Sequence, residues 1–190
     1  MKILTVKFGQ KYHSNLVNRF LEYGDVYCYT DNKKDLSQDV NVLDPIKIHN
    51  SINPLFYKLH LFSSQMPREE WVYFDLDVVI YGDVTKLFRR DFTVCFSYWR
   101  DKKEMTKYTR TMLNSGVMSW YNNPEEIYNY FINNEDEVKR FWPGIDPYIE
   151  NLCFDYNVYE PDIIGMRNKW TKKPIIELSP RGFVQPSNVF

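Results

Sequence analysis

The 190-residue sequence contains no alanine, only 7 glycines and only 3 cysteines. Cys28, Cys95 and Cys153 lie far apart, form no Cys-x-x-Cys pair and are odd in number, which favours free thiols in a reducing compartment over a disulfide framework. The absence of alanine beside many Asn, Lys, Ile, Tyr and Phe residues is typical of an A/T-rich coding source such as a virus. This bias says nothing about chemistry.

No charge of one sign dominates, because 24 Lys and Arg residues nearly balance 25 Asp and Glu residues. A net charge of −1 lacks the basic excess that binding to a phosphate backbone needs, so we expect no nucleic-acid partner. No apolar run approaches the ~18 residues of a membrane-spanning helix, and the N-terminal segment is charged again at Lys7. We therefore expect a cytoplasmic protein without a membrane span, located in the host cytoplasm if its source is viral.

Aromatic residues are abundant, with 13 Phe, 5 Trp and 15 Tyr in a chain that is 44% hydrophobic. This composition excludes the disordered, collagen-like and disulfide-scaffold classes of protein. A chain of this length is expected to form one domain over residues 1–190 and to bury a sizeable core.

Apolar runs alternate with segments of helical spacing in the first half of the chain, and the second half is less regular. Strands are expected at 3–8, 26–30, 71–80, 92–98 and 113–120, with an apolar stretch at 40–48 that Pro45 interrupts and short extended pieces from Tyr159 onward. Helices are expected at 14–21 with Ser14 as the N-cap, at 54–62, at 124–131 and at 146–154, and a solvated loop at 133–137. This order predicts an α/β fold whose sheet is flanked by helices, with parallel strands in its first half.

The segment Asp75-Leu76-Asp77 lies late in the most apolar run of the chain. At the period of a strand both carboxylates project to the same side, and two anions placed there need a cation or hydrogen-bond donors to compensate them. A divalent ion that prefers hard oxygen ligands, Mn²⁺ or Mg²⁺, meets that need and keeps positions open for diphosphate oxygens. The alternative is an Asp-x-Asp segment that merely caps a turn.

The same residues, Phe74 to Val78, also fit the opening motif of haloacid-dehalogenase-type phosphatases, with Asp75 as nucleophile and Asp77 as general acid. That family normally carries its motif on the first strand, whereas about seventy residues with their own strands and helices precede it here. We find no later strand that ends in the acidic pair which that family uses for Mg²⁺. The phosphatase is therefore the second hypothesis.

Six segments follow one another between residues 3 and 150 in a specific order. They are Ile3–Tyr12, Val26–Asp31, Tyr57–Leu59, Val72–Asp83, Leu113–Met118 and Gly144–Pro147. Together they resemble small nucleotide-sugar glycosyltransferases with the GT-A fold, near the glycogenin and galactosyltransferase type, which include short bacterial and viral members. The resemblance implies a Rossmann-like nucleotide- and metal-binding half over residues 1–83, an acceptor and donor-sugar half over 84–190, and a mixed central sheet flanked by helices.

This resemblance also implies transfer of a sugar from a nucleotide-diphosphate donor, a UDP-sugar, to a glycan or glycoprotein acceptor with Mn²⁺ or Mg²⁺ as cofactor. It implies Asp75 and Asp77 as metal ligands, and Asn114 and Asp146 as catalytic residues. The implied donor-binding residues are Lys7, Phe8, Gly9, Tyr12, Thr30, Asp31, Lys58, Asp75 and Ser115.

Several of these residues have structural alternatives. Lys58 could be an ordinary exposed lysine on a helix, Tyr12 a core residue, Asn114 a turn residue, and Asp146 a helix N-cap after Gly144. The segment from Arg100 to Thr111 is expected to contribute to the acceptor pocket or to be a plain surface loop.

The C-terminal segment departs from the family pattern. Ser179 stands where the family commonly has a His that ligates the metal, and Gln185 stands where it has a Lys that meets the diphosphate. Pro147 replaces a glutamine, and Arg181 is a candidate for the missing positive charge. These departures keep open a third hypothesis, a nucleotide-sugar-binding module without catalytic activity.

Overall fold

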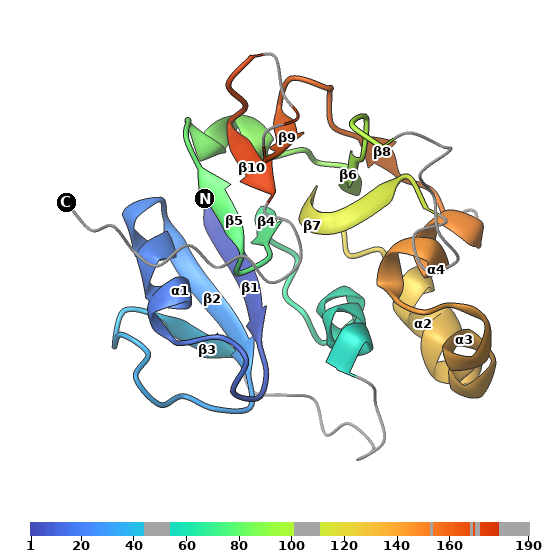
Figure 1. Cartoon of the computed structure of the whole chain (residues 1–190). Helices are drawn as coiled ribbons and strands as arrows, with labels where there is room; N and C mark the ends of the chain where they lie inside the picture. Colours follow the sequence, from blue (N-terminus) through green and yellow to red (C-terminus); the bar gives the residue numbers. More distant parts are fainter. Residues whose placement is uncertain (44–53, 101–110, 153, 168, 170–171, 179–190) are drawn as a thin grey trace.

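The structure is a computed structural model that describes residues 1–43, 54–100, 111–152, 154–167, 169 and 172–178. It contains a mixed seven-stranded sheet in the order β3-β2-β1-β4-β7-β6-β8 and a second, three-stranded sheet in the order β5-β10-β9 (Figure 1). Helices flank the larger sheet, so the predicted α/β fold with a mixed central sheet is confirmed.

Four parallel strands form the first half of the larger sheet. They are β1 (Lys2–Lys7), β2 (Asp25–Thr30), β3 (Asn41–Leu43) and β4 (Trp71–Phe74). The chain leaves β1 toward β2 and β3 on one side and returns to β4 on the other side of β1. In such sheets, ligands bind beyond the carboxyl ends of the strands where the order reverses, which here is the junction of β1 and β4.

The remaining strands of this sheet come from the second half of the chain. They are β7 (Leu113–Trp120), antiparallel to β4, β6 (Thr93–Phe96), antiparallel to β7, and β8 (Asn157–Val158), parallel to β6. The small sheet consists of β5 (Val78–Ile80), β9 (Ile164–Met166) and β10 (Ile176–Leu178).

The expected single strand at 71–80 is wrong, because it is divided between the two sheets. Trp71–Phe74 forms β4 and Val78–Ile80 forms β5, with a turn at 75–77 between them. The Asp75 backbone N–H donates to the Gly116 carbonyl on β7 at 2.8 Å, the last backbone hydrogen bond to the larger sheet among the described residues of this segment, and the chain then turns toward β10. The two aspartates therefore lie on a turn and not along a strand.

Two expected helices are shorter or tighter than the sequence predicts. The segment 14–21 divides into α1 (Asn15–Asn18) and the 3₁₀ helix η1 (Arg19–Glu22), and Ser14 makes no side-chain cap because its hydroxyl donates to the Lys34 carbonyl at 2.6 Å. The segment that Pro54 opens is the 3₁₀ helix η2 (Pro54–Phe62). A further 3₁₀ helix, η3 (Val84–Leu87), follows β5 and begins at Asp83, whose side chain accepts from the Thr85 N–H.

Three helices lie in the second half of the chain: α2 (Glu125–Asn133), α3 (Glu135–Phe141) and α4 (Ile145–Asn151). Of these, α2 and α4 pack against η2, and α3 packs against α2. The predicted helices at 124–131 and 146–154 are present, although the second ends earlier. The expected loop at 133–137 is wrong, because most of it lies in α3. Val138 is fully buried, and Glu135 pairs with Lys139 one turn later, so burial and an ion pair stabilise this helix despite its charged sequence.

Side chains on the two faces of the large sheet enter two separate cores. On β4, Trp71 and Tyr73 pack in the core under η2, α2 and α4, whereas Val72 and Phe74 pack in the core under α1 and η1. Cys28 and Cys95 are buried free thiols. Among the helices of the described segments, none has both the length and the apolar character needed to cross a bilayer.

Candidate functional site

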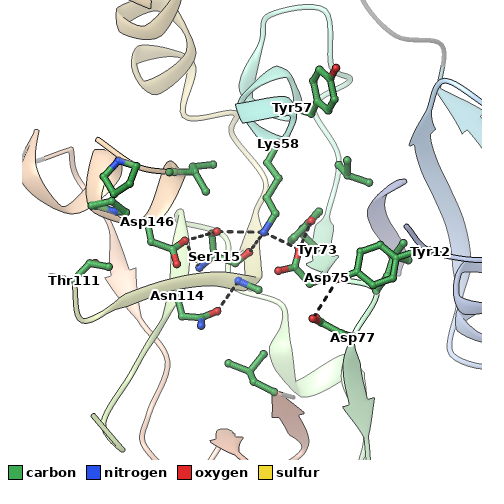
Figure 2. Close-up of a pocket in the computed structure, with 18 of the residues that line it drawn as sticks. Tyr12, Tyr57, Lys58, Tyr73, Asp75, Asp77, Thr111, Asn114, Ser115 and Asp146 are labelled. Carbon is green, nitrogen blue, oxygen red and sulfur yellow. Dashed lines mark hydrogen bonds and ion pairs between the residues drawn. The ribbon is translucent and has the colours of Figure 1, made fainter. Parts of the chain in front are cut away.

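A cleft of about 620 Å³ lies at the carboxyl ends of β1 and β4 (Figure 2). Its wall is formed by the loop after β1, by η2, by the turn after β4, by the start of β7 and by the start of α4. The polar and aromatic residues that line it are Phe8, Lys11, Tyr12, Tyr57, Lys58, Tyr73, Asp75, Asp77, Arg100, Thr111, Asn114, Ser115 and Asp146. The cleft therefore occupies the place where the sheet order predicts a ligand site.

The Asp75 carboxylate is held by groups from two elements, β4 and η2. Its Oδ1 accepts a hydrogen bond from the Tyr73 hydroxyl at 2.6 Å and forms an ion pair with Lys58 Nζ at 2.6 Å. Lys58 extends from η2 into the cleft and lies 5.1 Å from the centre of the Tyr73 ring (Figure 2). Burial, followed by the Asp75 charge, holds the pKa of Tyr73 well above its ordinary value, so this phenol stays protonated as a donor.

Asp77 lies on the same turn and faces the loop after β1. The Tyr12 hydroxyl donates a long hydrogen bond of 3.5 Å to Asp77 Oδ2. Burial, followed by the neighbouring charge of Asp75, raises the pKa of Asp77, while Lys58 and then Lys11 oppose the rise. Two carboxylates that repel each other in one partly buried site are the arrangement that a cation stabilises.

The segment Asn114-Ser115-Gly116 forms the opposite wall. Asn114 Oδ1 accepts from the Gly116 N–H at 2.8 Å, and Lys58 Nζ lies 3.2 Å from both the carbonyl and the hydroxyl oxygen of Ser115. Asp146 Oδ1 accepts from the Ser115 N–H at 2.9 Å and from its hydroxyl at 2.5 Å. The chain of contacts from Asp75 through Lys58 and Ser115 to Asp146 thus joins the two walls of the cleft (Figure 2).

Asp146 lies in the first turn of α4, and Gly144 occupies the N-cap position that we considered for it. One of its two carboxylate oxygens is taken by Ser115. The side chain therefore fixes the start of β7 against α4 through Oδ1.

The structure brings together eight of the predicted site residues along the cleft: Phe8, Tyr12, Lys58, Asp75, Asp77, Asn114, Ser115 and Asp146. The other four predicted donor-binding residues lie beside the cleft and do not line it. Lys7 and Thr30 are buried at the ends of β1 and β2, and the Asp31 carboxylate accepts from the Gly9 N–H at 3.2 Å. Gly9 adopts a positive φ of 65°, which explains a glycine there. Ser179, Arg181 and Gln185 lie outside the described residues.

Sequence reasoning did not identify several residues of the cleft. Tyr73 precedes Asp75 by two residues, so strand alternation places both on one face and could have revealed the pair. Lys11 and Tyr57 are next to the predicted residues Tyr12 and Lys58 in the sequence, but only the folded structure shows that their side chains line the cleft. Arg100, from the segment expected near an acceptor, lines the cleft and donates to the Thr111 carbonyl at 2.5 Å.

A divalent ion would find hard oxygen donors on Asp75 and Asp77. Among the residues that the structure describes, no group of three or more His, Cys, Asp or Glu side chains could hold a metal ion. Two carboxylates suit Mn²⁺ or Mg²⁺ when substrate phosphates complete the ligand set, so the donor set fits an ion that binds together with a diphosphate.

Sequence comparison finds no matching family model and no matching curated protein. Structural comparison finds glycosyltransferases. The glycosyltransferase GlyE of Streptococcus pneumoniae TIGR4 superposes with a TM-score of 0.56 and 16% identity over 85% of this chain, which spans only 45% of GlyE.

Two other similar structures are matched over most of their own length. An active-site mutant of LgtC superposes with a TM-score of 0.59 and 13% identity, and the superposition covers 94% of this chain and 87% of LgtC. A glycosyltransferase involved in the glycosylation of the major capsid of PBCV-1 superposes with a TM-score of 0.59 and 12% identity. That superposition covers 93% of this chain and 91% of the PBCV-1 enzyme. At these identities the likeness concerns the fold, and the chain has the GT-A fold of these small glycosyltransferases.

Proposed function

We propose that the protein is a metal-dependent glycosyltransferase that moves a sugar from a nucleotide-diphosphate donor, a UDP-sugar, to a hydroxyl group of a glycan or glycoprotein acceptor. The observation that carries this proposal is the placement of Asp75 and Asp77 on a turn that faces a cleft at the junction of β1 and β4. An LgtC structure holds donor and acceptor sugar analogs, which supports the same class of ligands for this chain.

In such a transfer the diphosphate departs as negative charge builds on its oxygens, and positive charge fixed around it stabilises that change. When bound, Mn²⁺ or Mg²⁺ would supply part of this positive charge, held by Asp75 and Asp77. The Lys58 ammonium contacts Asp75 and Ser115, so it lies between the carboxylates and the wall proposed for the sugar. Lys11 adds a second cation at the loop after β1.

The opposite wall offers hydrogen-bonding groups for the sugar. Asn114 has its Oδ1 directed to the Gly116 N–H, which leaves its amide N–H₂ as a donor for a sugar hydroxyl. Only a glycine fits at position 116 without displacing this wall, because a Cβ there would lie 2.8 Å from Asn114 Oδ1 and 3.4 Å from Asp75 Oδ2. For Asp146 we propose a role toward the acceptor hydroxyl through its other carboxylate oxygen, Oδ2.

The phosphatase hypothesis loses support, because the Asp75 motif follows the fourth strand of a mixed sheet and not the first. The non-catalytic module keeps one supporting observation, the lack of a third acidic, His or Cys ligand beside the two aspartates among the described residues. Binding of a UDP-sugar without its consumption would distinguish this module from the enzyme.

Thermal unfolding in the presence of UDP, Mn²⁺ and both together tests the proposal. A ligand present at 100 times its dissociation constant stabilises the folded state by about 2.7 kcal/mol, which raises the melting temperature by several degrees. We expect the pair to raise it more than either component alone, and Asp77→Asn to remove the gain. Asp162→Asn, which changes an exposed carboxylate, is the matched control.

Release of UDP from a panel of UDP-sugars then tests catalysis and names the sugar. If neither UDP nor GDP shifts the unfolding transition with or without metal, the proposal is wrong.

A further inference from the structure

A half-buried arginine lies behind the turn that carries Asp75 and Asp77, outside the cleft. Arg19 belongs to η1, and its Nη2 donates to the Leu76 carbonyl at 2.9 Å and to the Val78 carbonyl at 2.6 Å. Both hydrogens of this nitrogen are thereby used. The two carbonyls belong to the residues on either side of Asp77, so one guanidinium fixes the backbone both before and after that carboxylate.

The turn has few other anchors. Apart from the β5–β10 ladder, which begins where Val78 pairs with Leu178, two further backbone hydrogen bonds hold it among the described residues: Asp75 N–H to the Gly116 carbonyl at 2.8 Å and Val78 N–H to the Asp75 carbonyl at 3.4 Å. The first fixes the turn where it leaves β4, and the second is long. The peptide groups around Asp77 therefore depend on Arg19 for their orientation.

Arg19 is placed at the turn although one of its polar atoms is unsatisfied there. Its Nε is buried without a hydrogen-bond partner, which is unfavourable for an arginine. Its guanidinium also stacks beside the Phe20 ring at 5.0 Å, which keeps the side chain directed at the turn. Of the donors of this guanidinium, Nη2 is thus directed at the two carbonyls of the turn while Nε stays unpaired.

We propose that Arg19 is a positioning residue for the carboxylate turn: by binding the Leu76 and Val78 carbonyls it directs Asp77 into the cleft, where Asp77 meets the metal and the diphosphate. This inference rests on the proposed function. Arg19 does not line the cleft, so its effect on ligands passes through the turn.

The test compares UDP affinity in the presence of Mn²⁺, measured by isothermal titration calorimetry, among four proteins. Arg19→Met removes both hydrogen bonds, and Arg19→Lys keeps a cation with donors but loses the planar guanidinium. Val17→Ala is the matched control, because Val17 is fully buried in the same core and its side chain has no donor for either carbonyl. Urea unfolding of each variant measures how much folding stability each change removes.

We expect Arg19→Met to weaken UDP binding at least tenfold relative to Val17→Ala, and Arg19→Lys to recover part of the loss. If Arg19→Met does not fold, Arg19→Lys decides the test, with an expected loss of at least threefold against the same control. Affinities within twofold of Val17→Ala in both variants would overturn the inference and leave the proposed function intact. Absence of UDP binding in the unmodified protein would instead overturn the proposed function, and this inference with it.

Discussion

His60 lies on η2, two residues after Lys58, and its substitution gives a quantitative test of the packing beside the site. The imidazole is buried. Its ring centre lies 6.1 Å from that of Tyr29 in a stacked arrangement and 5.3 Å from that of Tyr128 in an edge-on arrangement. Neither of its ring nitrogens has a hydrogen-bond partner. Burial therefore lowers the pKa of His60 from 6.5 to about 4, with Glu135 opposing the shift only in part.

The sign of the effect follows from proton linkage. Between these two pKa values the unfolded chain binds a proton at His60 and the folded protein does not, so stability falls as the pH is lowered through this range. A shift from 6.5 to about 4 corresponds to a full loss of about 3 kcal/mol below pH 4. Between pH 7 and pH 5 the expected loss is about 2 kcal/mol.

His60→Phe keeps an aromatic ring against Tyr29 and Tyr128 and removes the titration. Urea unfolding at pH 7 and pH 5 measures the free energy of unfolding for both proteins. We expect the unmodified protein to lose about 2 kcal/mol more than His60→Phe over this interval, since other groups titrate alike in both. His13→Gln, which removes an exposed imidazole, is the control. Equal pH dependence in the unmodified protein and His60→Phe would refute the reasoning.

Three further predictions concern the cleft. Gly116→Ala places a Cβ 2.8 Å from Asn114 Oδ1, and we expect it to lower the free energy of unfolding by about 1–3 kcal/mol in urea titrations. Lys58→Met leaves the partly buried Asp75 without its cation, and we expect a loss of about 1–3 kcal/mol in the same assay and weaker UDP binding by calorimetry. Lys58 also opposes the rise in the pKa of Asp77, so Lys58→Met should raise that pKa further. On acidification, calorimetry should therefore show the affinity for Mn²⁺ in the presence of UDP beginning to fall at a higher pH in Lys58→Met than in the unmodified protein.

Local sequence patterns were sufficient to predict β1 and β2 and the parallel arrangement of the first half of the sheet. Strands such as β1 and β2 are short apolar runs bounded by polar or glycine residues, and their alternation with helical spacing leaves few arrangements. The pair Asp75 and Asp77 was found for a related reason, because two carboxylates in so apolar a run need compensation.

What the sequence did not reveal depends on contacts between distant residues. The run from Trp71 to Ile80 is uniformly apolar apart from its aspartates, so nothing local indicates that it leaves one sheet and enters another. Gly116, which bonds the start of the intervening turn, lies 41 residues after Asp75 in the sequence. Arg19, which holds the turn, lies 57 residues before Leu76. Likewise, the charged sequence of α3 is typical of a loop. Its helix is stabilised by the burial of Val138 against distant residues, which no local pattern indicates.

The charges of the cleft explain why metal and nucleotide are expected to bind together. Its described lining contains three carboxylates, Asp75, Asp77 and Asp146, and three cations, Lys11, Lys58 and Arg100, so the wall is balanced before any ligand enters. A divalent cation alone must approach Asp75 against the Lys58 ammonium, and a diphosphate alone must approach Lys58 against two carboxylates. The diphosphate of a UDP-sugar carries two negative charges, so together with a divalent ion it leaves the balance unchanged. Each ligand therefore removes the repulsion that opposes the other, which by linkage makes the coupling between them reciprocal.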